Sequence, residues 1–328
     1  MQDLFSDYKI FKLDPYKLRS RDFFKNMLEY RKSTMKKFEE AILSSSHFKC
    51  LLCGKDKKTF YLELGKYKLF QCNACSLVSP NINFNKLSNR EVYDDPAYVK
   101  DTTREILDTF QYRKNTYAPE RLSYILSRVD IKKRNIKLLD VGCGPGYFIN
   151  YLADLGIYYK GLEFAEFLVK ICKEKGLNVE GNDVSEEKNN SYNIITLFDV
   201  VEHIADPLPF FKILNKKLIK EGRLIAYTPN IHSLSYYLMG SLQNTLLPFQ
   251  HLCFFDKRSL EYLSKRSGFT LESIEFFGLD VMDYFFMKEY QDKVRYLSNL
   301  KDFISVMQSI VDKQNLSNHL RVVLKKIK

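Results

Sequence analysis

The stretch Leu-Leu-Asp-Val-Gly-Cys-Gly-Pro-Gly-Tyr, residues 138–147, decides the fold that we expect for this chain. It begins as an apolar strand and continues as a glycine-rich turn, after which the spacing of apolar residues becomes helical. Because glycine has no Cβ, a ligand could lie close to the main chain at Gly142, Gly144 and Gly146. We therefore predict a nucleotide-sized ligand at this turn. The alternative is a plain glycine turn in an unrelated α/β domain.

Two classes of cofactor bind to such turns, and the spacing of the glycines favours one of them. Dinucleotide-binding turns read G-x-G-x-x-G, whereas this turn reads G-x-G-x-G. Asp140 precedes the first glycine, and Glu163 follows the strand-like residues 157–162, where it is well placed to accept both hydroxyls of a ribose. The stretch resembles motif I of the class I methyltransferases that use S-adenosylmethionine (SAM). The resemblance implies that Glu163 holds the ribose of SAM.

The resemblance extends along most of the last two hundred residues. A helix and a short strand, residues 165–180, lead to Asn182 and Asp183, where family members place a polar side chain against the adenine amino group. The strand at 192–198 is apolar enough to be buried on both faces, and its last residue, Phe198, completes the expected cofactor-binding set. Alternating strands and helices predict a doubly wound, Rossmann-like α/β sheet. Its seven-stranded order, with an antiparallel last strand, is implied by the resemblance.

The remaining elements of this sheet follow in the same alternation. Their expected bounds are a helix at 207–220, a strand at 223–227, a helix at 257–267, a strand at 271–277 and an edge strand at 320–324. In such a sheet, ligands bind at the carboxyl ends of the strands.

A second motif lies ahead of this domain and predicts a metal site. Cys50-x-x-Cys53 and Cys72-x-x-Cys75 are separated by a spacing typical of a four-cysteine zinc site. Residues 59–70 alternate in the manner of a hairpin with Gly65 at its bend. Disulfides and four free core cysteines are the alternatives, and we favour zinc because the chain has no secretory signal. All four ligands come from the protein, so the zinc would be structural.

Composition indicates a protein of more than one structural unit without a membrane span. The chain has 328 residues and no run of eighteen apolar residues, and its N-terminus lacks the pattern of a signal peptide, so we expect a cytoplasmic location. The net charge of +11 is compatible with nucleic acid, an anionic membrane or an anionic substrate. Because the basic residues are scattered in small clusters, we favour a solvated basic surface and regard a nucleic-acid partner as the weaker reading.

The chain divides into four expected segments. These are a helical N-terminal arm at 1–46, a zinc ribbon at 47–82, a helical linker or cap at 83–134 and the SAM-binding domain at 135–328. The arm is helical over 22–43, and the linker holds a long helix at 103–128 that Pro119 is expected to kink or split. Related enzymes use such a linker to cover SAM, a role that would fall to Tyr93, Tyr98 or Tyr112.

Histidines that follow strands are the candidates for a catalytic base. Methyl transfer requires a base only where the nucleophile must lose a proton, and histidine is suited to that task near neutral pH. His251 and His203 are the favoured candidates, and His232 is a third. His319 and His47 are given no role.

The segment Asp199-Val-Val-Glu-His203 suggests a separate possibility. A similar segment in ubiquinone-pathway O-methyltransferases can hold a divalent cation that binds the acceptor, and Asp199, Glu202 and His203 offer suitable ligand atoms. Many SAM enzymes without a metal carry Glu-His at this place, so the motif alone leaves a catalytic cation as the less favoured alternative.

The whole arrangement, from Phe48 onward, resembles the bacterial zinc-ribbon methyltransferases of the methyltransferase-23 type. The resemblance implies a small-molecule or glycan acceptor, such as the sugar of a surface polysaccharide or specialised metabolite. The chain lacks the large C-terminal domain of the deoxysugar C-methyltransferases, which favours methylation of oxygen. An RNA methyltransferase and a non-catalytic SAM-fold binding protein remain as alternatives, although the fourth strand lacks the Asn/Asp-Pro-Pro-aromatic run of base-amino methylation. The acceptor, the methylated atom and the oligomeric state are not determined by the sequence.

Overall fold

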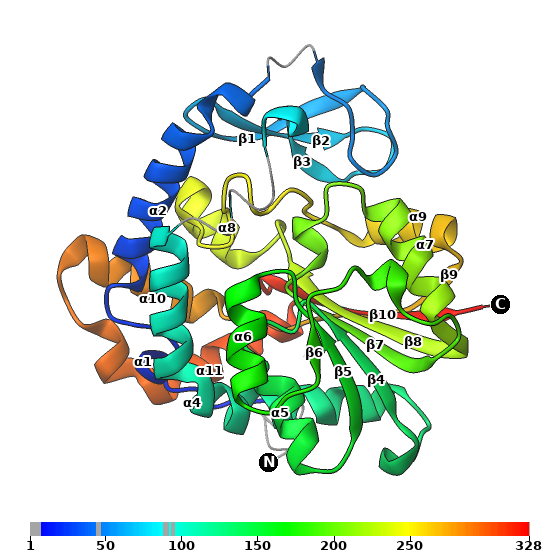
Figure 1. Cartoon of the computed structure of the whole chain (residues 1–328). Coiled ribbons are helices and arrows are strands. Elements are labelled where there is room, and N and C mark those ends of the chain that lie inside the picture. The colour runs from blue at the N-terminus through cyan, green and yellow to red at the C-terminus, as the bar shows by residue number, and fades with distance from the viewer. Residues whose placement is uncertain (1–7, 44–46, 88–91, 93–95, 328) are drawn as a thin grey trace, which may run out of the picture.

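The computed structural model describes residues 8–43, 47–87, 92 and 96–327, with the backbone alone at 96–98, 100–102 and 106. Its centre is a seven-stranded sheet in the order β6-β5-β4-β7-β8-β10-β9. The strands are β4 (Lys137–Val141), β5 (Tyr158–Leu162), β6 (Val179–Glu180), β7 (Tyr192–Phe198), β8 (Leu218–Pro229), β9 (Phe269–Phe276) and β10 (His319–Lys326). Strand β10 runs antiparallel to its neighbours β8 and β9, so the expectation of an edge strand at 320–324 was wrong and β9 lies at the edge. The predicted doubly wound α/β fold is confirmed (Figure 1).

Helices cover both faces of this sheet because its side chains alternate between two cores. Leu139 and Ile195 belong to one core, whereas Leu138 and Ile194 belong to the other. The first core takes side chains from α7 (Pro207–Lys217) and α9 (Lys257–Ser267). The second takes them from α4 (Pro96–Arg128), α5 (Tyr147–Asp154) and α6 (Glu166–Glu174). Burial on both faces explains why β7 is almost continuously apolar.

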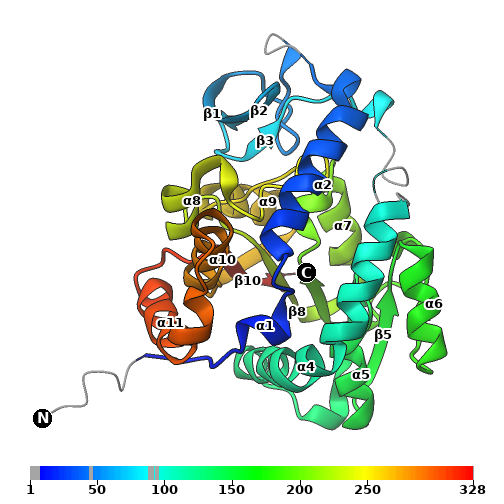
Figure 2. The same ribbon diagram turned by 90° about the vertical axis from the view of Figure 1, so that its left-hand side faces the viewer.

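Helix α4 is continuous, so the chain is not split at Pro119. A proline inside a helix costs about 3 kcal/mol because it removes a hydrogen bond and crowds the preceding turn. Ala118, Leu122 and Ile125 offset that cost, since all three are buried in the core that α4 shares with α5. Figures 1 and 2 show α4 changing direction along its length, so the chain bends without being split.

The cysteine segment forms a small sheet of its own. The hairpin is confirmed as β1 (Lys58–Leu64) paired with β2 (Tyr67–Cys72), and Gly65 takes a left-handed φ of +56° at the bend. A third strand, β3 (Val78–Pro80), pairs with β2. We call residues 48–80 the ribbon. Figure 1 shows the ribbon above the large sheet, against the segment that joins α8 (Leu234–Met239) to α9.

The N-terminal arm packs against two helices from the far end of the chain. Its helices are α1 (Pro15–Leu18) and α2 (Phe23–Lys37), and their partners are α10 (Asp280–Asp292) and α11 (Tyr296–Lys313). Leu18 and Phe24 of the arm share one core with Phe286 and Leu297. The helical arm is confirmed over 23–37, whereas α10 and α11 were not predicted. Figure 2 shows α2 descending from the ribbon toward α10.

Single 3-10 turns complete the connections. They are η1 (Glu39–Ala41), η3 (Phe84–Lys86), η4 (Lys133–Asn135), η5 (Val184–Glu186), η6 (Val201–His203) and η7 (Gly240–Leu242). Two of these turns, η5 and η6, lie directly after the carboxyl ends of β6 and β7, where ligands are expected.

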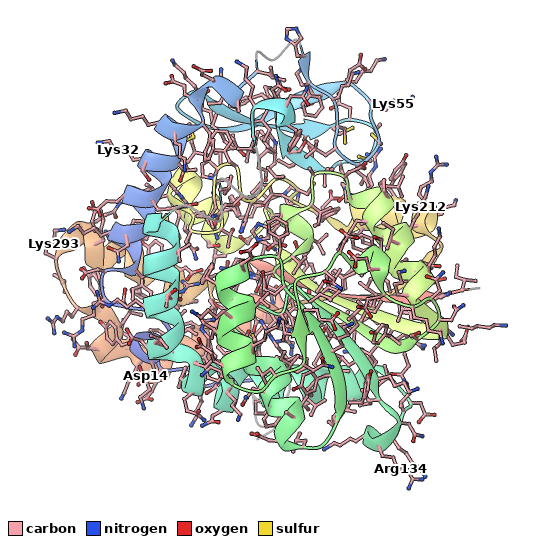
Figure 3. All side chains as sticks on the ribbon, in the orientation of Figure 1. Asp14, Lys32, Lys55, Arg134, Lys212 and Lys293 are labelled. Atoms are coloured by element: carbon pink, nitrogen blue, oxygen red, sulfur yellow. The ribbon has the colours of Figure 1, made fainter. Side chains whose placement is uncertain are left out.

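Cationic side chains are spread over the surface. In Figure 3 the labelled Lys32, Lys55, Arg134, Lys212 and Lys293 extend from five different parts of the chain. Within the described ranges, none of the helices is both long and apolar enough to cross a membrane.

Candidate active site

The glycine turn has the left-handed backbone that its sequence requires. Gly142, Gly144 and Gly146 have φ angles of +69°, +55° and +82°. A Cβ at Gly142 would lie 2.5 Å from Val200 Cγ2, and one at Gly146 would lie 2.7 Å from a methyl carbon of Leu177. A Cβ at Gly144 would meet nothing within 4 Å. Two glycines are thus required by packing within the protein, and only Gly144 borders space that a ligand could fill.

Glu163 is held against this turn by backbone donors. The Gly144 amide donates to Oε2 over 2.8 Å, and the Ala165 amide donates to Oε1 over 2.9 Å. Burial raises the pKa of Glu163, although these two amides oppose the shift. A carboxylate has lone pairs left after accepting two hydrogen bonds, so it could also accept hydroxyl groups. Its position fits the predicted ribose contact.

Asp140 lies inside the sheet rather than on its ligand-binding edge. The side chain is buried, and its Oδ1 accepts a 2.6 Å hydrogen bond from the Thr196 hydroxyl. Burial raises the pKa of Asp140 to about 7, and the Thr196 hydrogen bond and the charge of Arg121 limit the rise. Asp140 therefore joins β4 to β7 beneath the turn.

Asn182 and Asp183 follow β6, the strand that ends beside Glu163. Both side chains are exposed. Asp183 caps η5 by accepting the Ser185 amide over 2.7 Å, and hydrogen bonds from the Ser185 hydroxyl and amide lower the pKa of Asp183. The cap leaves this carboxylate with further acceptor capacity at the sheet edge, as the predicted adenine contact requires.

A buried arginine that sequence reasoning missed lies beside the turn. The guanidinium carbon of Arg121 is 4.0 Å from the centre of the Phe198 ring and 5.1 Å from that of Tyr147, the first residue of α5. One terminal nitrogen lies 3.8 Å from Asp199 Oδ2. The Nε of Arg121 is buried and has no hydrogen-bond partner among the described residues. A cation placed in this way could bind a carboxylate.

A cleft of about 510 Å³ opens at the carboxyl edge of the sheet. The arm forms one wall, α4 contributes the stretch 104–113, and Asn244, Thr245 and Leu247 contribute another part of the lining. Asp199, Glu202, His251 and His319 also line it. Asp199 and His319 further line a smaller cavity of about 130 Å³ that includes Arg121. Asp199 and His319 therefore join the cleft to the cavity that holds Arg121, whose guanidinium lies beside Tyr147 at the end of the glycine turn.

His319 belongs to this region, contrary to the expectation that it has no role. Its Nε2 lies 3.3 Å from Asp199 Oδ1, and its Nδ1 lies 3.0 Å from Asn318 Oδ1. Desolvation by the surrounding protein would raise the pKa of Asp199, whose side chain is 47% exposed, but His319 and Arg121 lower it to about 2. Asp199 also has a left-handed φ of +59°, a strained conformation that is common at functional sites. The signal that could have found His319 is the antiparallel direction of β10, which brings its first residue to the ligand-binding edge.

The structure gathers Glu202 and His203 with His251, whereas the sequence suggested Asp199 as the third member. One potential ligand atom from each of the three lies within 4.8 Å of the others. Asp199 is directed toward His319 and Arg121 instead. Burial raises the pKa of Glu202 well above its usual range and lowers that of His203 to about 4. Glu202 Oε1 and His251 Nδ1 are buried without a hydrogen-bond partner among the described residues, so this set of one carboxylate and two imidazoles stays a candidate for the alternative catalytic cation.

The remaining expectations for this region concern two histidines and three tyrosines. The Tyr112 hydroxyl accepts the Asp14 amide and so fastens the arm. Tyr93 and the Tyr98 side chain lie outside the described residues. His232 lies 3.4 Å from the Tyr61 hydroxyl of the ribbon, and His47 is exposed.

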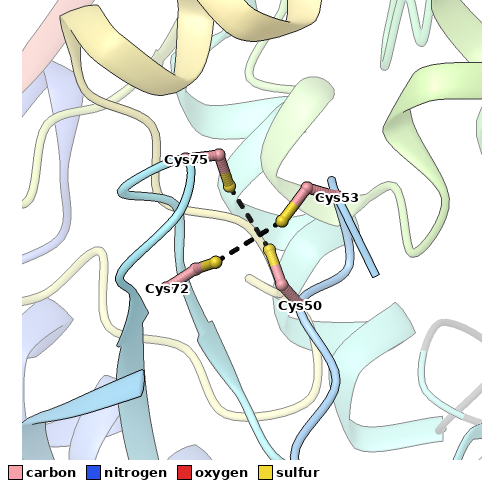
Figure 4. Close-up of side chains that lie close together, drawn as sticks. All are labelled: Cys50, Cys53, Cys72 and Cys75. Carbon is pink, nitrogen blue, oxygen red and sulfur yellow. Dashed lines mark hydrogen bonds between the residues drawn. The ribbon is translucent and has the colours of Figure 1, made fainter. Parts of the chain in front are cut away.

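The four ribbon cysteines are arranged as a tetrahedral metal site requires. The sulfur atoms of Cys50 and Cys75 are 3.5 Å apart, and those of Cys53 and Cys72 are 3.4 Å apart (Figure 4). All four lie within 4.8 Å of one another. Four sulfurs about 2.3 Å from a shared zinc ion would be separated by roughly 3.8 Å. The donor set and its spacing therefore fit zinc.

A family model described as a methyltransferase domain matches residues 110–274 of the chain. The ubiquinone biosynthesis O-methyltransferase of Xanthomonas oryzae pv. oryzae (strain PXO99A) is 30% identical over 123 residues, which is 34% of this chain and 50% of that protein. The chain thus matches about half the length of such curated relatives.

Two solved structures share the fold. One is Haemonchus contortus phosphoethanolamine N-methyltransferase 2 in complex with SAM, with a TM-score of 0.50 and 17% identity over 76% of this chain and 63% of that one. The other comes from the complex between the Haloferax volcanii Trm112 methyltransferase activator and the putative methyltransferase, with a TM-score of 0.50 and 13% identity over 74% of this chain and 98% of that one.

Proposed function

The chain belongs to the methyltransferase-domain family whose model matches residues 110–274, and on this premise we propose that it methylates a hydroxyl group of a small-molecule or glycan acceptor with SAM. The observation that carries the proposal is the open space at Gly144, beside a carboxylate held by two backbone amides. Relatives that are named as O-methyltransferases support oxygen as the accepting atom. The acceptor would occupy the cleft of about 510 Å³.

The residues around the turn fit the chemical groups of SAM. Glu163 would accept the ribose hydroxyls, and the exposed Asp183 would contact the adenine amino group. Arg121, a buried cation with an unpartnered Nε, would bind the carboxylate of the methionine part. When bound, SAM supplies a methyl group on a positively charged sulfur, and the acceptor oxygen must lie in line with it.

His251 is the residue that we propose as the base. It lines the cleft, and its buried Nδ1 has no hydrogen-bond partner among the described residues. Burial lowers the pKa of His251 well below its usual range, so the ring is neutral near pH 7 and its Nδ1 lone pair is open to a hydroxyl, although the same shift makes the ring a weaker base than a free imidazole. The other candidate, His203, has its Nδ1 2.9 Å from the Gln250 carbonyl oxygen, which makes it more suitable for holding the His251 segment.

We further propose that Cys50, Cys53, Cys72 and Cys75 hold a structural zinc ion. The separation of their sulfur atoms supports four-coordinate binding with no position left for a substrate. Removal of this zinc is expected to loosen the ribbon rather than to remove a reactive group.

The proposal is tested by calorimetry and by transfer of labelled methyl groups. The metal-loaded chain should bind SAM and its demethylated product, S-adenosylhomocysteine. It should also label members of a panel of free sugars, nucleotide sugars and phenols. His251→Ala should bind the cofactor normally and lose turnover, whereas His47→Ala, an exposed control, should behave as the wild type. Failure to bind SAM would refute the proposal, and equal turnover in the two variants would remove His251 as the base.

A further inference from the structure

The ribbon contacts the catalytic domain on the segment that carries the proposed base. We call residues 249–256 the histidine loop. We propose that the ribbon holds the histidine loop in its conformation, and we call this role the brace. The cysteine-bound metal would then be needed to position the acceptor side of the active site but not the cofactor side. The inference rests on the proposed function of His251. Its structural part can be tested without any methyl transfer.

Main-chain hydrogen bonds join the ribbon to the histidine loop. The Phe254 amide donates to the Val78 carbonyl oxygen over 2.9 Å, and the Val78 amide donates to that of Phe254 over 3.1 Å. This antiparallel pair extends the ribbon sheet by one bridge beyond β3. The Phe249 amide donates to the Tyr67 hydroxyl over 3.3 Å, and the two rings are 5.1 Å apart. His251 lies between these two attachments.

Side chains fasten the end of the loop. The Ser76 hydroxyl donates to Asp256 Oδ1 over 2.6 Å, and Asp256 caps the start of α9. Arg258, in the first turn of α9, donates to the Ala74 carbonyl oxygen over 2.8 Å. Ala74 and Ser76 are the two neighbours of Cys75. The metal-binding turn is therefore tied directly to both the loop and the helix that follows it.

The opposite side of the loop is attached to the sheet edge. The Leu252 and Cys253 amides both donate to the Glu202 carbonyl oxygen, over 2.7 and 3.0 Å. The Gln250 carbonyl oxygen lies 2.9 Å from His203 Nδ1. Residues 249–255 contain no helix and only isolated bridges, yet all are buried. A buried irregular segment depends on its neighbours for its conformation. Here those neighbours are the ribbon, η6, the end of β8 through the Asn230–Phe255 bridge, and the arm, whose Tyr30 hydroxyl accepts from Gln250 Nε2 over 2.7 Å.

The cofactor side has separate supports. Glu163 is held by Gly144 and Ala165, and the glycine turn packs on Val200 and Leu177. None of these residues belongs to the ribbon. Loss of metal from the cysteines should therefore move the histidine loop and leave the SAM site in place.

Hydrogen exchange followed by mass spectrometry tests the brace on the full chain. Removing the metal with a chelator should increase exchange at 249–256 and leave 138–147 unchanged. The affinity for S-adenosylhomocysteine should stay within about twofold, whereas kcat should fall on the order of tenfold or more because the base is displaced. Unchanged exchange at 249–256 after metal loss would overturn the inference.

A matched pair of tyrosine variants tests the same point with the metal bound. Tyr67→Phe removes a hydroxyl that accepts from the histidine loop, and Tyr61→Phe removes one that donates to the Ile231 carbonyl oxygen outside it. We expect faster exchange at 249–256 and lower kcat in Tyr67→Phe alone. Equal behaviour of the two variants would overturn the brace even if metal removal unfolds the ribbon. If the exchange changes occur but the metal-loaded chain transfers no methyl group, the brace stands and the proposed function fails.

Discussion

Two alanine substitutions at the glycine turn test different things. Gly144→Ala fills space that we assign to the cofactor, whereas Gly142→Ala crowds a neighbouring side chain of the protein. Both residues have a left-handed φ, which costs an alanine about 1–2 kcal/mol. At Gly144 the new methyl group meets nothing within 4 Å, so the free energy of unfolding should fall by about this amount only. At Gly142 the methyl group would lie 2.5 Å from Val200 Cγ2, which adds roughly 1–3 kcal/mol for overpacking.

Gly142→Ala should therefore be the more damaging variant for stability, and Gly144→Ala the more damaging variant for cofactor binding. In urea denaturation, Gly142→Ala should be the less stable variant, and Val200→Ala in the same chain should restore part of the loss by removing the crowded methyl. In calorimetry, Gly144→Ala should bind S-adenosylhomocysteine at least about tenfold more weakly, a loss of about 1.4 kcal/mol. Wild-type affinity in Gly144→Ala, or a larger loss of stability there than in Gly142→Ala, would refute the assignment of the open space to the cofactor.

Three further predictions concern charged groups near the turn. Glu163→Gln keeps one carbonyl oxygen for a backbone amide but loses the charge, so we expect weaker SAM binding in calorimetry with a smaller loss of stability than Glu163→Ala. Asp140 has a pKa of about 7 in the folded state, so the unfolded chain binds fewer protons between about pH 4 and 7, and the stability that Asp140 contributes falls as pH rises through this window. The urea midpoint of the wild type should fall as pH rises through this window, and the fall should be smaller in Asp140→Asn because other buried carboxyl groups still contribute. His319→Ala removes a group that lowers the pKa of Asp199, so that pKa should rise when the carboxylate is titrated by NMR; an unmoved pKa would contradict the coupling.

The parts of the fold that repeat a local pattern were predictable from the sequence. Strand β7 and helix α9 have the predicted bounds because their apolar spacing, and the Asp256 cap and Gly268 end of α9, are local signals. Strand β8 begins earlier than predicted, at Leu218, because pairing with Tyr192 of β7 extends it. Helices α10 and α11 were not predicted because they lie outside the alternation of strands and helices that builds the sheet.

The candidate site was predictable where one segment supplies it. The glycine turn, Glu163 and the four cysteines are each recognisable from short spacings. Arg121 and His319 gave no such signal, because their importance arises from Phe198 and Asp199, which lie far from both in the sequence. Such pairings depend on strand order and direction, and a lone arginine or histidine does not reveal them.

The contacts of the N-terminal arm impose an order on assembly. Arg19 pairs with Asp283, and the Tyr16 hydroxyl lies 3.0 Å from Glu289, so the arm is joined to residues more than 260 positions later in the chain. During synthesis the arm emerges long before α10 and cannot dock until α10 has followed, whereas β4 and β7 on either side of the glycine turn can already pair. The wall that the arm contributes to the cleft is therefore among the last parts to form, and a nascent chain should acquire its cofactor pocket before its acceptor pocket.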